Sequence, residues 1–257
     1  MIYVNNFTFY KLFLLLAGAV LFATLPTNNI KNTSDDTSDD TSDDTTVPQA
    51  VWHWGMLFNM FMTLLATTYT CLTFAVITMS TWGQMLFMEL LEVDTLTAGG
   101  IVSVYEIGGF CGSFLSGFVA DFVAQKLETF GSPRSYPAVL CCGIASASAI
   151  SMQIYSTSYL GCQVCAFGYG FGTFGAISMF GLMAREYVES EYSGILTAYL
   201  AVASQVGAFC AGTPLAWLYE TKPIADGFMI VACVVPVSLL CMSALTFVSK
   251  KYKQKRE

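Results

Sequence analysis

Glu106 is the one acidic side chain that lies deep inside a long apolar stretch of this sequence. Placing an ionisable side chain at the centre of a membrane-spanning helix costs about 2.5 kcal/mol or more, so such residues are usually functional. We therefore expect Glu106 to belong to a binding site, and the alternative is a hydrogen bond that ties two helices together. Gln205 lies in a second apolar stretch, where it either lines a cavity or joins helices.

Residues suited to catalysis or metal binding are scarce. His53 is the only histidine, and the sequence has no Gly-rich phosphate loop and no recognisable set of nucleophile, base and orienting group. The nine cysteines, with Cys162 and Cys165 in a C-x-x-C spacing, fall almost entirely inside apolar stretches, where we expect them to fill contacts between helices. We expect no enzyme activity, no cofactor and no metal site.

The elements that must position these residues are membrane-spanning helices. Of the 257 residues, 55% are hydrophobic and 11% are charged, whereas soluble domains carry about 25% charged residues. The apolar residues gather in blocks of about 20, the length of helix that crosses about 30 Å of hydrocarbon. The blocks are 9–25, 51–79, 99–123, 136–155, 160–183, 193–218 and 224–248.

An acidic tract separates the first block from the other six. Residues 33–46 are almost a Thr-Ser-Asp-Asp repeat and account for much of the net charge of −7. Such a tract cannot bury enough apolar surface to become ordered. The predicted organisation is an N-terminal transmembrane segment at 1–30, an acidic disordered cytoplasmic linker at 31–50, a six-span unit at 51–249 and a basic cytoplasmic tail at 250–257. No basic patch suited to nucleic acid is present.

The distribution of Lys and Arg predicts the orientation in the bilayer. With the C-terminus in the cytoplasm, only Lys11 and Lys222 lie on the other side, as the positive-inside rule requires. The basic residues then placed in the cytoplasm are Lys31, Lys126, Arg134, Arg185, Lys250, Lys251, Lys253, Lys255 and Arg256.

Two of the apolar blocks are rich in glycine, which lets the backbones of neighbouring helices approach closely. We expect these helices to pack tightly and to slide or rock against their neighbours. The residues concerned are Gly99, Gly100, Gly108, Gly109, Gly112 and Gly117 in one block, and Gly161, Gly168, Gly170, Gly172, Gly175 and Gly181 in the other.

Residues 104–121 resemble a pattern of the major facilitator superfamily. The sequence E-I-G-G-F-C-G-S from Glu106 is similar to the E-V-G-G-x-x-G-S of the organophosphate:phosphate antiporters, the group that includes the glucose-6-phosphate translocase of the endoplasmic reticulum. Gly117 and Asp121 then match a G-x-x-x-D element, in which the Asp closes a helix before a cytoplasmic loop and can pair with basic groups. Further landmarks follow the family's order, at 82–84 (W-G-Q), 131–134 (G-S-P-R), 180–186 and 206–214.

The resemblance covers about residues 52–250 and implies an all-α polytopic fold, the C-terminal six-helix half of a major facilitator transporter, here with one N-terminal span. It implies exchange of a sugar phosphate, similar to glucose 6-phosphate, for inorganic phosphate by alternating access. Trp82 would then stack on the sugar and Gln84 would bind a hydroxyl, alongside Glu106 and Gln205; Trp82 is alternatively an interfacial belt residue. Gly117 and Asp121 would form a conformational loop motif.

This chain departs from the family at the positions expected to hold phosphate. A phosphoryl group in a low-dielectric cavity needs fixed cations, but Val76 occupies the position of the family's basic residue before W-G-Q, and Thr81 replaces its Asp. Only one block precedes the six-span unit. Transport would therefore require a missing N-terminal half or a dimer, and the alternative function is that of a non-transporting membrane partner or regulatory protein derived from the family.

The C-terminal tail indicates a location. Lys253 and Lys255 form a K-x-K-x-x arrangement that resembles a coat-binding retrieval signal, and this favours the endoplasmic reticulum membrane. The alternative is that these lysines only anchor the cytoplasmic end of the last helix.

Overall fold

The structure is a computed structural model that describes residues 59–126, 134–155, 158–187, 193–221 and 224–253. The chain divides into two compact units, Met1–Trp52 and His53–Glu257. The predicted N-terminal span at 1–30 and the acidic linker at 31–50 lie outside the described residues, as does His53. Of the predicted basic tail, residues 250–253 continue the last helix.

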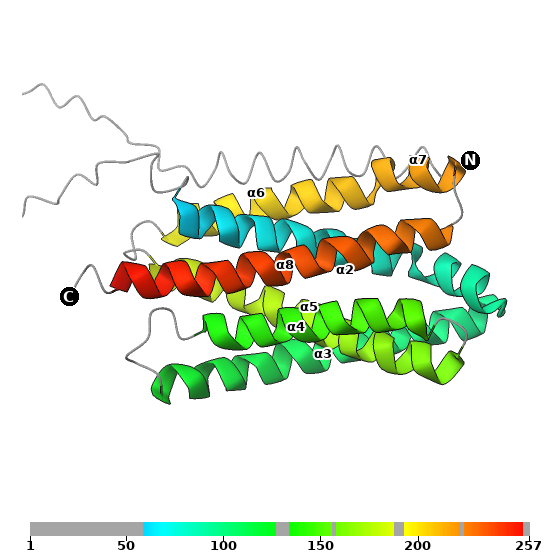
Figure 1. The fold of residues 1–257 in the computed structure, drawn as a ribbon, viewed down its shortest axis with the longest axis horizontal. Coiled ribbons are helices and arrows are strands. Elements are labelled where there is room, and N and C mark those ends of the chain that lie inside the picture. Colours follow the sequence, from blue (N-terminus) through cyan, green and yellow to red (C-terminus); the bar gives the residue numbers. More distant parts are fainter. Residues whose placement is uncertain (1–58, 127–133, 156–157, 188–192, 222–223, 254–257) are drawn as a thin grey trace, which may run out of the picture. The chain divides into compact units, whose positions relative to one another are not determined.

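The described part of the second unit is built of α-helices (Figure 1). Six spans in this part are long and apolar enough to cross a membrane, and α6 and α7 together form one of them, Ser193–Tyr219. The predicted all-α polytopic fold is therefore confirmed. The helices are α2 (Met60–Leu91), α3 (Thr95–Lys126), α4 (Ser135–Ile154), α5 (Tyr159–Tyr187), α6 (Ser193–Ala211), α7 (Thr213–Thr221) and α8 (Ile224–Lys253).

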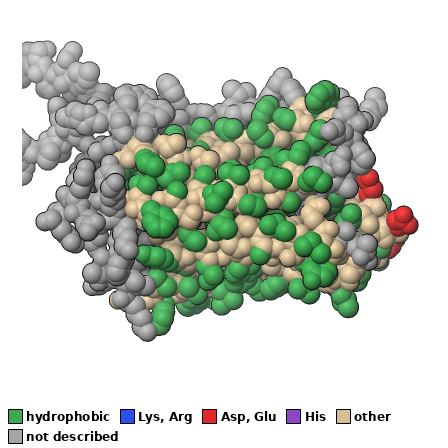
Figure 2. Space-filling model, viewed as in Figure 1, with side chains coloured by type: hydrophobic (Ala, Val, Ile, Leu, Met, Phe, Trp, Pro, Cys, Tyr) green, Lys and Arg blue, Asp and Glu red, His purple; other side chains and the backbone are tan. Residues whose placement is uncertain are grey.

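The two ends of the six-span unit carry opposite charge. Figure 1 shows the end of α3, the start of α4 and the end of α8 at the same end of the unit. The described basic residues lie at these three helix ends and near the end of α5. The exposed acidic residues Glu89, Glu92 and Asp94 lie at the other end, around the turn between α2 and α3 (Figure 2). Between the ends, the visible described surface shows hydrophobic side chains among uncharged atoms and no charged side chains, as expected for a surface in contact with lipid.

The turn between α2 and α3 is defined by two acidic residues. Glu92 ends α2 in the left-handed conformation, with a φ of 51°. Asp94 precedes α3, and its carboxylate accepts a hydrogen bond from the Thr97 hydroxyl. This bond, with bonds from backbone N–H groups, holds the pKa of Asp94 below its usual value. Helix α3 begins at Thr95, a turn before the predicted apolar block, and α2 continues through Trp82 and Gln84 to Leu91.

Backbone contact between helices dominates the packing of α3 on α5. A Cβ atom added to Gly108 would lie 2.3 Å from the Phe167 carbonyl oxygen, and one added to Gly112 would lie 2.2 Å from that of Phe171. In the other direction, a Cβ on Gly170 would lie 2.0 Å from the Tyr105 carbonyl oxygen. These distances are too short for any side chain, so the predicted close packing of the glycine-rich helices is confirmed here.

Candidate functional site

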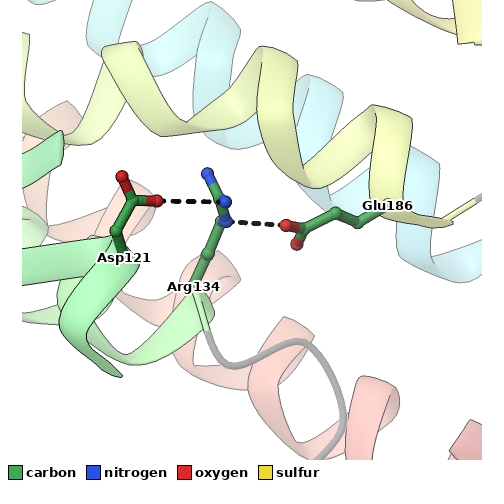
Figure 3. A network of polar contacts seen from close by, with 3 residues as sticks. All are labelled: Asp121, Arg134 and Glu186. Carbon is green, nitrogen blue, oxygen red and sulfur yellow. Dashed lines mark ion pairs between the residues drawn. The ribbon is translucent and has the colours of Figure 1, made fainter. Parts of the chain in front are cut away.

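Three charged side chains meet at the basic end of the unit. Arg134 lies directly before α4, between Asp121 near the end of α3 and Glu186 near the end of α5 (Figure 3). A terminal guanidinium nitrogen lies 3.1 Å from the Asp121 carboxylate, and Nε lies 2.6 Å from the Glu186 carboxylate. The planar guanidinium can face two acids at once, which a lysine ammonium does less well. One cation thus joins three helix ends.

The exposure of these side chains indicates which of the two ion pairs is stronger. The Arg134 side chain is 17% exposed, whereas that of Asp121 is 64% exposed and that of Glu186 is 39% exposed. Water screens the pair with Asp121 more strongly, so we expect the pair with Glu186 to contribute more. With two carboxylates and one guanidinium, the group carries a formal charge of −1.

The same end of the unit is also tied to α2. Tyr187, next to Glu186, stacks on Phe61 with ring centroids 4.1 Å apart, and the Asn59 side-chain amide donates a hydrogen bond of 2.6 Å to the Tyr187 hydroxyl. The ion pairs and the Tyr187 contacts therefore connect the ends of α2, α3, α4 and α5. These side-chain contacts couple the positions of the four helix ends.

Gly117, the other residue of the predicted loop motif, lies one turn before Asp121 on α3. A Cβ at Gly117 would meet no described atom within 4 Å. Sequence reasoning assigned Asp121 and Gly117 to this site but left out Arg134 and Glu186. The signal for both was present, since Arg134 ends the G-S-P-R landmark and Glu186 ends the landmark at 180–186.

Glu106 lies near the middle of a membrane span. It stands eleven residues after Thr95, the first residue of α3, which at 1.5 Å per residue is about half of a 30 Å hydrocarbon layer. Its Oε1 accepts a hydrogen bond of 3.0 Å from the Ser80 hydroxyl of α2. The side chain is nevertheless exposed on the surface of the described unit. Glu106 thus makes the predicted interhelical bond and also remains open to a further partner.

Gln84 lies one turn after Ser80 on the same seam between α2 and α3. Its side-chain amide donates a hydrogen bond of 3.1 Å to the Thr95 carbonyl oxygen. Like Glu106, it is exposed. We call Ser80, Gln84 and Glu106 the polar seam; it places two of the predicted substrate-binding residues along one helix pair.

Trp82 and Gln205 have other surroundings. The Trp82 indole N–H donates a hydrogen bond of 3.0 Å to the Ala211 carbonyl oxygen at the end of α6, and the ring meets that of Tyr219 on α7 edge to face, with centroids 5.1 Å apart. Trp82 therefore contacts α6 and α7, whereas Gln84 contacts α3. Gln205 lies half-buried on α6. The structure does not gather the four predicted residues into one cluster of contacts.

The cysteines that the structure describes are all free thiols. Among the described residues, no three or more His, Cys, Asp or Glu side chains come together in a way that could hold a metal ion. The candidate site therefore consists of two parts, the ion-pair group at the basic end and the polar seam at the middle of the membrane.

The fold and this distribution of charge define a multi-pass α-helical membrane protein. No family model matches the sequence. The chain is 27% identical to the membrane sensor protein UhpC of Escherichia coli (strain K12) over 187 residues, which are 73% of this chain and 42% of that protein. It is 28% identical to UhpC of Salmonella typhimurium, also over 187 residues, or 73% of this chain and 41% of that protein.

The chain thus spans about two fifths of the length of these curated relatives. Both relatives are bacterial, so they do not support the predicted location in the endoplasmic reticulum. They do support a relationship to membrane sensor proteins, at an identity too low to carry over any single residue's role.

Proposed function

We propose that this protein recognises a sugar phosphate within the membrane and responds by an alternating-access movement of its six-span unit. In the transport form of this function, a sugar phosphate similar to glucose 6-phosphate is exchanged for inorganic phosphate. The observation that carries the proposal is the polar seam. Ser80 and Glu106 meet near mid-depth, the level at which transporters with this kind of helix arrangement bind their substrates.

The polar seam suits the sugar part of such a ligand. The exposed carboxylate of Glu106 and the side chain of Gln84 can bind hydroxyl groups, whereas an anionic carboxylate repels a phosphate. The basic residues among those described lie near helix ends and not beside the seam. We therefore propose that the phosphate is held by cations from outside the described unit, supplied by a further six-helix half or by a second copy of the chain.

A second candidate function is sensing, in which the ligand is bound but not carried across. It is favoured by the similarity to UhpC, which is named as a membrane sensor protein. The ion-pair group of Arg134 would then pass the conformational change to a cytoplasmic partner. In either form we propose no enzyme activity, and we propose a location in the endoplasmic reticulum on the basis of the K-x-K-x-x tail alone.

Uptake into vesicles, measured together with binding, distinguishes exchange from sensing. The purified full chain is reconstituted with inorganic phosphate inside, and uptake of labelled glucose 6-phosphate is measured together with equilibrium binding in detergent. Uptake that depends on internal phosphate supports exchange, and binding without uptake supports sensing. Absence of both contradicts recognition by this chain or by a dimer of it.

Glu106→Gln tests whether the polar seam carries recognition. The amide keeps an acceptor for Ser80 but removes the charge, so we expect binding of glucose 6-phosphate to weaken by about tenfold, because a charge-assisted hydrogen bond to a sugar hydroxyl becomes a neutral one. Glu89→Gln is the matched control, because Glu89 is an exposed acid of α2 at the acidic end of the unit. Equal effects of the two substitutions would contradict a site at the seam.

A further inference from the structure

The span Ser193–Tyr219 is interrupted near its end. Helix α6 ends at Ala211 and α7 begins at Thr213, so that Gly212 alone separates them (Figure 1). Pro214 has no N–H and cannot donate to the carbonyl of Cys210 four residues earlier. The Gly212 N–H instead donates to the Phe209 carbonyl oxygen at 3.1 Å, one residue nearer than in a regular α-helix. Regular α-helical hydrogen bonding is therefore interrupted on the α6 side of Gly212, whereas on the α7 side the Ala216 N–H donates to the Gly212 carbonyl oxygen at 3.0 Å.

The two sides of the interruption differ in how they are held. Helix α6 is fixed to α2, because a Cβ on Gly207 would lie 2.2 Å from the Thr70 carbonyl oxygen and the Thr70 hydroxyl donates to the Ala203 carbonyl oxygen at 2.9 Å. Helix α7 has nine residues; Thr213, Pro214 and Trp217 are exposed, whereas Leu215 is buried. We call α6 the fixed arm and α7 the outer arm.

Trp82 bridges the two arms from α2. Its indole N–H donates to the carbonyl oxygen of Ala211, the last residue of α6, and its ring packs edge to face on Tyr219 in α7. Proline and glycine interruptions leave helix carbonyls without their intrahelical donors, and a side-chain donor from a neighbouring helix replaces them. The Trp82 side chain thus both donates to a carbonyl oxygen at the interruption and contacts α7 beyond it.

We propose that Gly212 is a hinge and that Trp82 is the latch that keeps α7 in its present position. Release of the indole from Ala211 and Tyr219 frees α7 to swing, which opens the unit at the end opposite the Arg134 ion pairs. This movement is a property of the α6–α7 span and does not depend on which ligand the protein binds. It also gives Trp82 a role that requires its N–H group, which stacking on a sugar does not.

Hydrogen–deuterium exchange of the full chain in lipid nanodiscs tests the latch. Trp82→Phe removes the N–H donor and keeps an aromatic ring for Tyr219, and we expect exchange in 213–221 to become about fivefold faster, the effect of losing one hydrogen bond. Trp82→Ala removes both contacts and should accelerate exchange further. Peptides of α3 and α5 should not change. Tyr219→Phe, which keeps the ring, is the control and should leave exchange in 213–221 unaltered.

Gly212→Ala tests the hinge from the other side. A Cβ at this position would lie 3.4 Å from the nearest atom, the Phe209 carbonyl oxygen, so alanine fits and stiffens the backbone. We expect slower exchange in 213–221 and a smaller effect of Trp82→Phe in this background. Unchanged exchange of α7 in both Trp82 variants would overturn the proposal. An equal acceleration in every helix would also overturn it, because Trp82 would then stabilise only the unit as a whole.

Discussion

Arg134 shows how much of this protein's organisation depends on single residues. Its guanidinium is the only cation between the carboxylates of Asp121 and Glu186 in the part of the chain that the structure describes. Removing it would leave two acids close together on separate helices, which repel one another. The ends of α3 and α5 would then lose the group that holds both of them to α4.

We predict that Arg134→Ala lowers the free energy of unfolding by about 1–2 kcal/mol, between the values for exposed and buried ion pairs. The measurement is thermal unfolding of the purified chain in detergent. Arg185→Ala is the control, since Arg185 is an exposed neighbour of Glu186. In the background Asp121→Asn with Glu186→Gln, the loss on removing Arg134 should shrink, because no unpaired carboxylates remain. A loss of the same size in that background would show that packing, not charge, is responsible.

Substitutions of Glu106 distinguish a residue that binds the ligand from one that only ties two helices together. If Glu106 serves a site, Glu106→Leu should abolish binding of glucose 6-phosphate while the free energy of unfolding falls by no more than about 0.5 kcal/mol, as is usual for exposed positions. The Ser80 hydroxyl is not stranded, because it can bond to a carbonyl of its own helix. Thermal unfolding and ligand binding are measured on the same preparation. If Glu106 instead ties helices together, Glu106→Leu and Ser80→Ala should lower stability alike.

At the scale of the helices, the contact between α3 and α5 depends on the absence of side chains. A Cβ on Gly112 would overlap the backbone of Phe171, whereas one on Gly117 would meet no described atom within 4 Å. We predict that Gly112→Ala costs about 1–3 kcal/mol, as overpacking does, and that Gly117→Ala is neutral or stabilises by up to about 1 kcal/mol through its better helix propensity. Thermal unfolding of both variants tests this, and equal losses would contradict the close contact.

Hydropathy predicted the helices well and their interruptions poorly. The blocks at 99–123, 136–155 and 160–183 correspond to α3, α4 and α5, because the number of apolar residues needed to cross lipid is fixed by helix geometry. The block at 193–218 was expected as one helix, and it is a single span in which α6 and α7 are separated at Gly212. An average over composition cannot detect that Pro214 lacks a donor, although the Gly-Thr-Pro sequence carried that information.

The candidate site was less accessible to sequence reasoning than the helices. Glu106 could be singled out because a charge inside an apolar block is conspicuous. Its bond to Ser80, and that of Trp82 to Ala211, join residues 26 and 129 positions apart, and no local pattern specifies such pairs. The resemblance to a known family supplied Asp121 but treated Arg134 and Glu186 as landmarks only. Their meeting depends on the tertiary arrangement of three helix ends.

For the whole molecule, the separation of charge predicts a single orientation. The basic end with Arg134 and Arg185 should face the cytoplasm, and the acidic turn between α2 and α3 should face the other side. In a chain whose native cysteines are replaced, we predict that a cysteine at Glu92 reacts with an impermeant maleimide from the non-cytoplasmic side and that one at Arg185 reacts from the cytoplasmic side. Reaction of both positions from the same side would refute the six-span topology.

The backbone contact between α3 and α5 also bears on the order in which the protein is made. Gly112 faces Phe171, so the partner of this surface is synthesised 59 residues later. At about 5–20 residues per second, Gly112 is synthesised about 3–12 s before Phe171. During that interval its glycine surface must rest against lipid or the insertion machinery. The tightest contact of the described unit is therefore one that forms only after both helices have entered the bilayer, and a pause in translation between them would prolong the interval in which α3 can meet a wrong partner.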